Sequence, residues 1–237
     1  MFNFSPTQYD VNFRFLNFQI RVHPFFWVLA LLLFVRTPIT TLREWLLELA
    51  AWTLAIFVSV LVHELGHAFV FRYMFFVESD IMLHGFGGVT VPHSPPRRYY
   101  GLKGLLSRIF LDAAGCLAEF ILAAIAFGLF CLLPNQNGFN LLSVVKFFLY
   151  CTTLISIIWG IFNLLPIYPL DGGQISREIF LFFSPQKGLA NSLIISLVTA
   201  GICIWMSLTY GMVFVAILLA FLAYQNYIEL NHRSFRY

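Results

Sequence analysis

The feature that most constrains this chain is a series of long apolar segments with little polar sequence between them. A helix of about 20 apolar residues is long enough to cross the hydrocarbon core of a bilayer. Hydrophobic residues make up 60% of the 237 residues and charged residues 11%, so lipid is the expected solvent for much of the surface. The candidate segments cover residues 22–36, 44–71, 105–133, 141–165, 189–208 and 211–229. They predict an all-α polytopic membrane protein with about six transmembrane helices, or five if 22–36 enters the membrane without crossing it.

The positions of the basic residues predict an orientation. With six spans, all 14 Lys and Arg residues fall on one side of the membrane except Arg36, Arg43 and Lys146. Basic residues concentrate on the cytoplasmic side, so both termini are expected there. The basic residues lie between apolar segments and do not gather on a soluble face, which argues against nucleic acid as a partner. The compact size favours a prokaryotic inner membrane.

The longest interruption between apolar segments covers residues 72–104 and is the only place where non-helical structure is expected. Within it, residues 81–84 and 89–91 are β-like runs on either side of Gly85-Phe86-Gly87-Gly88, which predicts a short hairpin. Non-helical backbone at membrane depth is tolerated only where protein or a cavity surrounds it. The chain is therefore expected to be a single integral-membrane domain, residues 1–237, with a membrane-embedded hairpin, a C-terminal helical hairpin at 189–229 and no appended soluble domain.

The strongest chemical signal is His63-Glu64-Leu65-Gly66-His67 near one end of the second apolar segment. Residues four apart share one face of a helix, so both imidazoles can bind one zinc ion. Glu64 is then placed to take a proton from the attacking water and pass one to the leaving amine. Ionisable side chains inside an apolar span are costly to keep there. This favours a functional site over a polar patch that joins helices.

A catalytic zinc site needs a third protein ligand and leaves one position open. Asp171 is the best candidate, because the fourth apolar segment ends on the same side of the membrane as His67. Pro166 and Pro169 break the helix before it, and Gly172-Gly173 permit close approach of the backbone. The alternative for Asp171 is a solvated residue at an ordinary exit from the membrane.

These two motifs, HELGH and the later NLLPIYPLDGG, resemble the site-2 protease family of intramembrane zinc metalloproteases. The resemblance covers about residues 44–173, the expected catalytic core. It implies one Zn²⁺ per chain, held by His63, His67 and Asp171, with Glu64 as the catalytic base. It also implies that the Gly85–Gly88 hairpin holds an unwound segment of a membrane-anchored protein substrate. A regulatory membrane partner would fit the same family, and the oligomeric state is open.

One position departs from the family pattern. The family often has Gly-Pro-x-x-Asn on the middle span, and this chain has Gly115-Cys116-Leu117-Ala118-Glu119. The family's asparagine is thought to position substrate or stabilise the oxyanion, and an ionised Glu119 cannot donate a hydrogen bond there. For Glu119, functional and structural roles remain equally open, and Asn163 is the preferred amide contact to substrate. Cys116 is expected to be a small buried hydrophobic residue.

Two alternatives of another class remain. The same ligands would suit a metal-binding transporter, although no internal repeat is visible. A catalytically inactive membrane scaffold would also retain the helices, but the complete set of ligands and base argues against it. Neither alternative requires Glu64 as a base.

Overall fold

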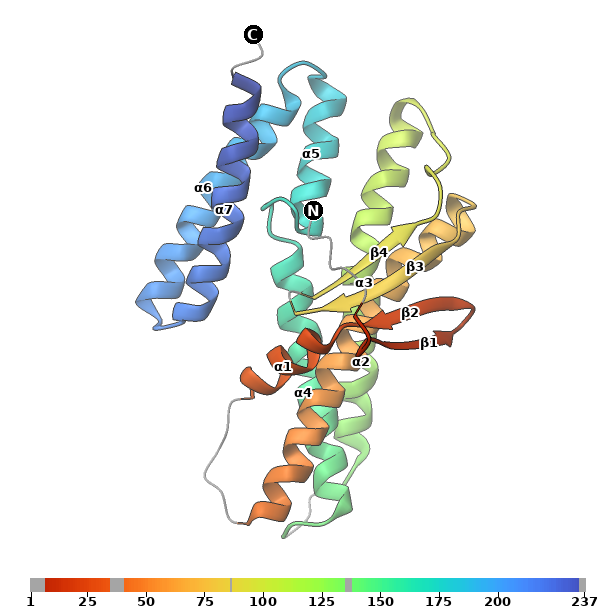
Figure 1. Ribbon diagram of the computed structural model, residues 1–237, viewed down its shortest axis with the longest axis vertical. Coiled ribbons are helices and arrows are strands. Elements are labelled where there is room, and N and C mark those ends of the chain that lie inside the picture. The colour runs from red at the N-terminus through yellow and green to blue at the C-terminus, as the bar shows by residue number, and fades with distance from the viewer. Residues whose placement is uncertain (1–6, 35–40, 86, 135–137, 235–237) are drawn as a thin grey trace. The chain divides into compact units, whose positions relative to one another are not determined.

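The computed structural model describes residues 7–34, 41–85, 87–134 and 138–234 (Figure 1). Its internal contacts define two compact units. The first combines residues 1–97 with 114–160, and the second combines 98–113 with 161–237. Two of the three boundaries, after residues 113 and 160, fall inside long helices, and neither unit is a single stretch of sequence.

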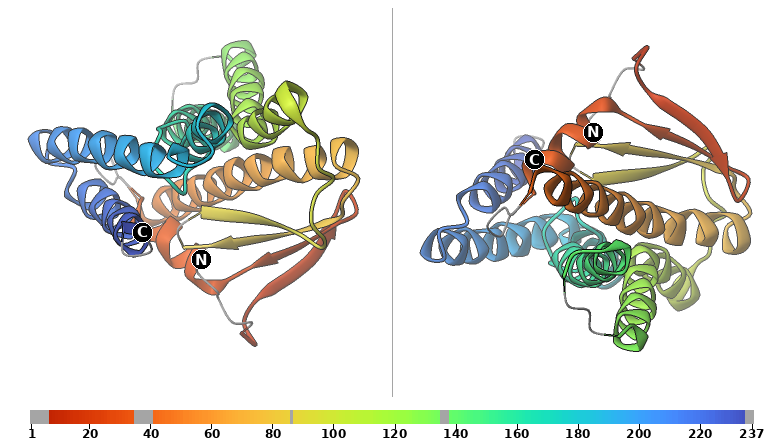
Figure 2. Two further views of the ribbon diagram at one scale, coloured as in Figure 1. Left: turned by 90° about the horizontal axis from the view of Figure 1, so that it is seen from above. Right: turned by 90° about the horizontal axis from the view of Figure 1, so that it is seen from below.

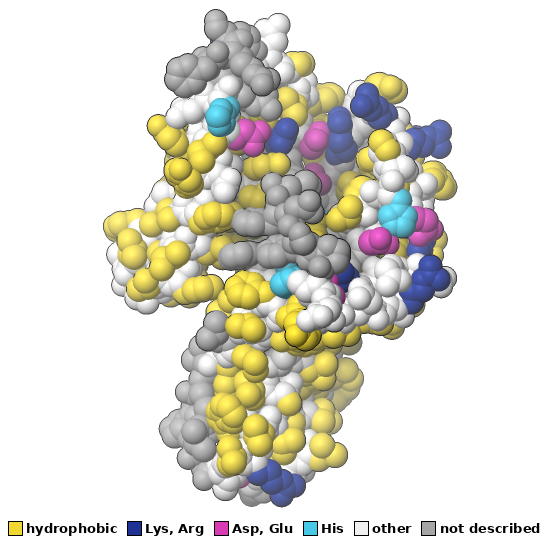
Figure 3. All heavy atoms as spheres, in the orientation of Figure 1, with side chains coloured by type: hydrophobic (Ala, Val, Ile, Leu, Met, Phe, Trp, Pro, Cys, Tyr) yellow, Lys and Arg dark blue, Asp and Glu magenta, His cyan; other side chains and the backbone are white. Residues whose placement is uncertain are grey.

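The fold is mostly helical, as predicted, with a small sheet. The helices are α1 (Pro24–Leu32), α2 (Leu42–Met74), α3 (Gly101–Leu132), α4 (Leu141–Asn163), α5 (Asp171–Phe183), α6 (Gly188–Thr209) and α7 (Val213–Ser234). The strands are β1 (Val11–Phe15), β2 (Phe18–Val22), β3 (Ser79–His84) and β4 (Gly87–Pro92). Within the described residues, five helices are long and apolar enough to cross a membrane, namely α2, α3, α4, α6 and α7. Apolar side chains cover the surface of the helical part drawn lowest in Figure 3, as lipid contact requires.

The first expected span, 22–36, is not a long helix in the described residues. It contains the end of β2 and then α1, whose nine residues extend only about 14 Å. Pro24 occupies the first turn of α1, and the Nδ1 atom of His23 accepts a hydrogen bond from the Phe25 amide at 3.2 Å. The last residues of the expected span lie outside the described residues. The described residues therefore contain five long apolar helices, and the connection from β2 to α2 is not one of them.

The sheet contains the predicted hairpin and a second one. Its strand order is β1-β2-β3-β4, with β1–β2 and β3–β4 antiparallel and β2–β3 parallel. The prediction for residues 81–91 is confirmed. The prediction that only residues 72–104 depart from helix is wrong, because β1 and β2 form a hairpin through Leu16 and Asn17. Both turn residues have positive φ, 50° and 65°, which suits a two-residue connection between twisted strands.

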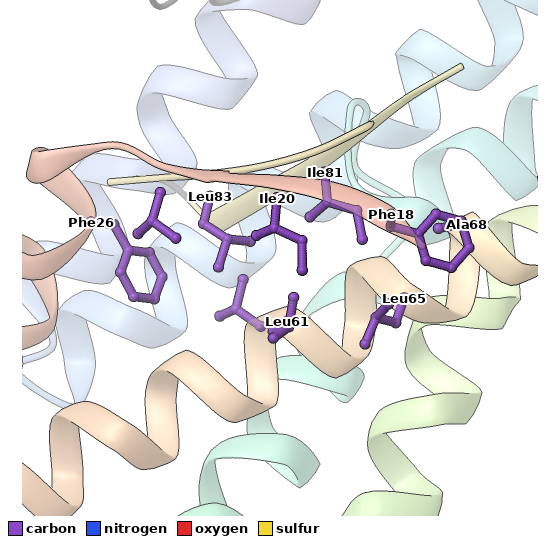
Figure 4. Packing of buried hydrophobic residues seen from close by; sticks show 10 residues of the cluster. Phe18, Ile20, Phe26, Leu61, Leu65, Ala68, Ile81 and Leu83 are labelled. Atoms are coloured by element: carbon purple, nitrogen blue, oxygen red, sulfur yellow. The ribbon is translucent and has the colours of Figure 1, made fainter. Parts of the chain in front are cut away.

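One face of β2 and β3 packs against the C-terminal half of α2 (Figure 4). The buried residues of this core are Phe18, Ile20, Val22, Phe26, Val60, Leu61, Leu65, Ala68, Ile81 and Leu83. Alternate residues of a strand share a face, which is why Phe18, Ile20 and Val22 all point inward. Figure 2 shows the sheet along one side of α2, with α4 along the other. The helix thus lies between the strands and α4 (Figure 2).

Close backbone contact joins α2 to the part of α3 in the same unit. A side chain at Gly66 would meet the main chain of α3, with the Cα of Gly115 only 3.0 Å from the added carbon. The helices can approach this closely because neither Gly66 nor Gly115 carries a side chain. On α4, the Ser156 hydroxyl lies 3.0 Å from that of Ser59. These contacts fix the position of α3 and α4 beside the histidines of α2.

In the second unit, α6 and α7 form the predicted helical hairpin. Its turn contains Gly211 at φ +71°. The loop before α5 is tied to both helices. Ser196 donates to the Pro166 carbonyl at 3.1 Å and accepts from the Tyr168 amide at 3.0 Å, while Asn226 donates to the Tyr168 carbonyl at 2.8 Å. Helix α5 itself was not anticipated from the sequence.

Candidate metal and catalytic site

The histidines of the HELGH motif converge as predicted. His63 and His67 lie one turn apart on α2, and their Nε2 atoms are 3.1 Å apart. Two nitrogens bound to one tetrahedral zinc at the usual Zn–N distance are about 3.4 Å apart. The separation therefore fits two ligands of one ion. His63 is buried, with 4% of its surface exposed, and His67 is half-buried.

Glu64 is also buried, and strand β4 holds its carboxylate. The hydroxyl of Thr90 lies 2.8 Å from Glu64 Oε2 and 3.0 Å from the main-chain carbonyl of Glu64. A side chain on Gly88 would collide with Glu64, coming within 2.7 Å of its Cδ. Gly88 and Thr90 are two residues apart on one strand, so both face Glu64. The strand thus provides space for the carboxylate and a donor that fixes one of its oxygens.

The second nitrogen of His63 contacts Glu119. The distance between His63 Nδ1 and Glu119 Oε2 is 2.9 Å, and Glu119 is fully buried. The Sγ atom of Cys116 joins this group, since ligand atoms of His63, Cys116 and Glu119 all lie within 4.8 Å of one another. Cys116 is buried, as expected from the sequence. Glu119 therefore faces a histidine of the motif.

Gly115 leaves open the space in front of the two imidazoles. A side chain there would meet His67 Nε2 and would lie 2.7 Å from His63 Nε2. A metal ion held by these nitrogens needs that space, so a glycine suits the position. The arrangement of His63, His67 and Gly115 fits a zinc ion on the chemistry of the donors and on the room beside them.

Asp171 and Asn163 belong to the second unit. Asp171 is the first residue of α5 and is buried, and Gly172 and Gly173 pack directly against the main chain of the preceding loop. The expectation that these glycines permit close backbone approach is confirmed. Asn163 is the last residue of α4 and is also buried. The roles of Asp171 as a metal ligand and of Asn163 as a substrate contact stay predictions.

The hairpin glycines have distinct neighbours. The ring of Phe25 fills the space beside Gly85. Gly87 adopts φ +121°, a conformation suited to glycine, and lies against the ring of Trp159. Gly88 faces Glu64, and Phe86 lies outside the described residues. The contact of Gly88 brings the beginning of β4 close to Glu64.

Two further histidines lie in or beside the sheet. His84 ends β3, and burial together with the nearby His23 lowers its pKa to about 4. His93, just after β4, is exposed, and its Nε2 atom lies 2.9 Å from Asp80 Oδ1. His84 is therefore held neutral at ordinary pH, and His93 is a surface residue.

Two residues of the site, Thr90 and Gly115, were not predicted from the sequence. Gly115 was noted only as part of a family pattern, and Thr90 only as part of a β-like run. Their roles depend on which residues of β4 and α3 face α2. A two-residue alternation from Gly88 to Thr90 is the one signal that could have linked Thr90 to Glu64.

The fold and the site are those of an integral membrane protein with a candidate metal centre, and comparison with known proteins gives its family. The profile of peptidase family M50 matches residues 51–143 and 136–208. The chain belongs to this family. It crosses the membrane several times, as its similarity to a solved site-2 protease and its apolar helices indicate.

Individual relatives support the assignment. A zinc metalloprotease of Methanocaldococcus jannaschii is 32% identical over 130 residues, covering 52% of this chain and 32% of the relative. Stage IV sporulation protein FB of Bacillus subtilis is 30% identical over 175 residues, covering 71% of this chain and 49% of the relative. The chain thus spans from about a third to about half of the length of these relatives. A solved site-2 protease from M. jannaschii has 25% identity and a TM-score of 0.56, with 94% of this chain and 95% of that chain covered.

Proposed function

We propose that this chain is an intramembrane zinc peptidase that hydrolyses peptide bonds of membrane-anchored protein substrates within or near the bilayer. The observation that carries the proposal is the pair of His63, which is buried, and His67, which is half-buried, whose Nε2 atoms converge beside a buried Glu64. Membership of peptidase family M50 supports a protein substrate. The apolar helices around the motif favour substrates that are themselves anchored in the membrane.

In this proposal His63, His67 and Asp171 hold one zinc ion. Zinc bound there would supply a Lewis acid for the peptide carbonyl and for water. Glu64 takes a proton from the attacking water and delivers one to the leaving amine. Thr90 keeps one oxygen of Glu64 fixed, so that the other is available for proton transfer. A carboxylate so held is pre-oriented for its role as base.

The hairpin and Asn163 are proposed to contact the substrate. An extended peptide can pair with an exposed strand edge, and β4 forms one edge of the sheet. The main chain at Gly85, Phe86, Gly87 and Gly88 would then lie beside the peptide. The amide of Asn163 would supply a hydrogen bond to substrate or to the developing oxyanion. A regulatory membrane partner is part of the proposal only through the family resemblance.

The proposed orientation has both termini on the cytoplasmic side. Arg72, at the end of α2, donates to the main-chain oxygens of Leu16 and Asn17 at 3.0 Å each, so the hairpin β1–β2 lies at that end of the helix. From this point α3, α4, α6 and α7 provide four crossings, which return the chain to the same side. Single cysteines at Tyr9 and Glu229, probed with a membrane-impermeant thiol reagent in sealed prokaryotic inner-membrane vesicles, test this. Labelling of the two positions from opposite sides would overturn it.

The function is tested by cleavage of a panel of single-span reporter proteins by purified wild type and Glu64→Gln, with zinc content measured for both. We expect wild type to cleave, and Glu64→Gln to retain zinc with about 10²–10⁴-fold lower activity. Asp171→Asn is expected to lose zinc. If both proteins retain zinc and neither cleaves any reporter, the peptidase proposal fails, and metal transport or a scaffold role takes its place.

A further inference from the structure

Glu119 stands where the family pattern has asparagine, and its surroundings suggest a different task. Its side chain is completely buried in the first unit, and Oε2 lies 2.9 Å from His63 Nδ1. The other ring nitrogen of His63 points to His67 at 3.1 Å. His63 is therefore contacted at both ring nitrogens. His67 lies beside Nε2, and the carboxylate of Glu119 lies beside Nδ1.

The chemistry of imidazole determines what Glu119 does in the metal-bound state. A neutral imidazole carries one proton, and the nitrogen that binds a metal must be the one without it. If His63 binds through Nε2, the proton is on Nδ1. Nδ1 then donates and Glu119 Oε2 accepts. An acceptor at this position selects the tautomer whose Nε2 lone pair is available, and it fixes the orientation of the ring.

Helix α3 presents two residues to His63 in complementary ways. Gly115 lies beside Nε2, where a side chain would occupy the space of the ion. Glu119 follows one turn later on the same face and reaches Nδ1. On α4, a carbon added at Gly160 would clash with the ring of Phe120 at 2.8 Å and would only touch Glu119 Oε2, at 3.4 Å. Gly115 and Glu119 thus approach the two ring nitrogens of His63 from one face of α3.

We propose that Glu119 is a positioning residue of the metal centre, which accepts the Nδ1 hydrogen bond of His63 and thereby raises the affinity of the site for zinc. The inference rests on the proposed function, because it assumes that His63 is a zinc ligand. According to this inference, Glu119 differs from the asparagine of the family pattern because it supports the metal ligand His63. A carboxylate buried in an apolar bundle is costly without a partner, and His63 supplies one.

The test compares Glu119→Leu and Glu119→Gln with wild type as zinc-loaded full-length chains in lipid nanodiscs. Zinc affinity is measured by competition with a chromogenic chelator, and the Co²⁺-substituted proteins are compared by visible absorption. Glu119→Leu removes the acceptor, and we expect about 10–100-fold weaker zinc binding. Glu119→Gln keeps an amide oxygen that can accept from Nδ1, so we expect it to recover part of the affinity.

Cys116→Ala is the matched control, because Cys116 lies in the same cluster. We expect its zinc affinity to remain within about twofold of wild type, since a residue that only packs there does not orient His63. Equal affinity of Glu119→Leu and wild type, with helical content retained, would overturn the inference. Loss of affinity in Cys116→Ala as large as in Glu119→Leu would also overturn it, because the ion would then sit among His63, Cys116 and Glu119.

The proposed function is tested by a different measurement, the cleavage of reporter proteins. If wild type binds zinc, depends on Glu119 for its affinity and cleaves no reporter, the peptidase proposal is wrong while the positioning role stands. If Glu119→Leu does not fold, the comparison of Glu119→Gln with wild type tests the inference instead. A Co²⁺ spectrum shifted from that of wild type supports the inference, and an unchanged spectrum with unchanged affinity contradicts it.

Discussion

The hairpin β3–β4 contacts α2 at Glu64, whereas the hairpin β1–β2 contacts it about two turns later, at Arg72. In the first contact, Thr90 and Gly88 of β4 surround a buried carboxylate. In the second, Arg72 joins the turn of β1–β2 and also pairs with Glu78, whose side chain is 60% exposed.

The two hairpins therefore have different expected roles, although they belong to one sheet. β4 orients a group that the proposed reaction uses, so small changes there should alter activity more than stability. β1–β2 supplies apolar core residues and a clamp at the end of α2, so changes there should alter stability more than activity. Variants of each hairpin can break this distinction.

The largest effect is expected for Gly88→Ala. The added carbon would lie 2.7 Å from Glu64 Cδ and would push the flexible side chain aside. A displacement of about 1 Å in a catalytic group can lower the rate by about 100-fold. We expect such a loss in reporter cleavage, with zinc content and thermal stability near those of wild type.

The control for this variant is Gly128→Ala on α3, where a side chain would meet nothing within 4 Å. Its activity should equal that of wild type. If Gly88→Ala cleaves as fast as Gly128→Ala, β4 does not constrain Glu64, and the proposed division between the two hairpins is lost.

Thr90→Val should have the next largest effect. Valine has nearly the shape of threonine and removes only the hydroxyl that donates to Glu64 Oε2 at 2.8 Å. Hydrogen bonds to charged groups contribute about 1.5–3 kcal/mol, so we expect a decrease in kcat of at least about tenfold. Thr90→Ser keeps the hydroxyl and should stay within about threefold of wild type. Equal kcat for the valine and serine variants would refute the role of this hydrogen bond.

The sequence predicted the residues whose signal is local. HELGH places two histidines on one helical face by spacing alone, and the Gly85–Gly88 run with β-like flanks predicted β3–β4. The β1–β2 hairpin was missed although its signal is present, since Val11, Phe13 and Phe15 alternate with polar residues, as do the inward-facing residues of β2. The apolar run that follows, residues 22–36, was interpreted as a membrane span, and the alternation of apolar and polar residues before it was not interpreted as strands.

What could not be predicted depends on tertiary packing. Glu119 was noticed because it departs from a pattern, but its partner His63 is 56 positions away in sequence. Likewise, nothing near Thr90 in the sequence indicates that its hydroxyl reaches Glu64. Such pairs follow from the close approach of α3 at Gly66 and from the register of β4 against α2, which no local pattern encodes.

Arg72→Ala tests the other side of the comparison. The guanidinium donates to two main-chain oxygens of the β1–β2 turn and lies 3.7 Å from the centre of the Phe18 ring. Because these contacts are partly exposed, we expect a loss of about 1 kcal/mol in the free energy of unfolding. Cleavage per folded molecule should change by less than about twofold. A large loss of activity with unchanged stability would mean that β1–β2 also supports the reaction.

The smallest effect is expected where the two hairpins meet, at His84 of β3 beside His23 after β2. Burial and the neighbouring His23 lower the pKa of His84 from 6.5 to about 4, so the unfolded chain takes up its proton more readily than the folded one. The contribution of neutral His84 to stability is complete above pH 6.5 and is lost as the pH falls toward 4. This loss should lower the apparent melting temperature as the pH falls through this range.

His84→Gln should flatten the dependence of melting temperature on pH between 6.5 and 4, because glutamine does not titrate. His93→Gln, at an exposed position, should keep the slope of wild type through this range. If the slope survives in His84→Gln and disappears in His93→Gln, the pH-sensitive contact lies at the free end of the β3–β4 hairpin. The junction between the two hairpins, where β2 and β3 pair, would then not be the part of the sheet that responds to acid.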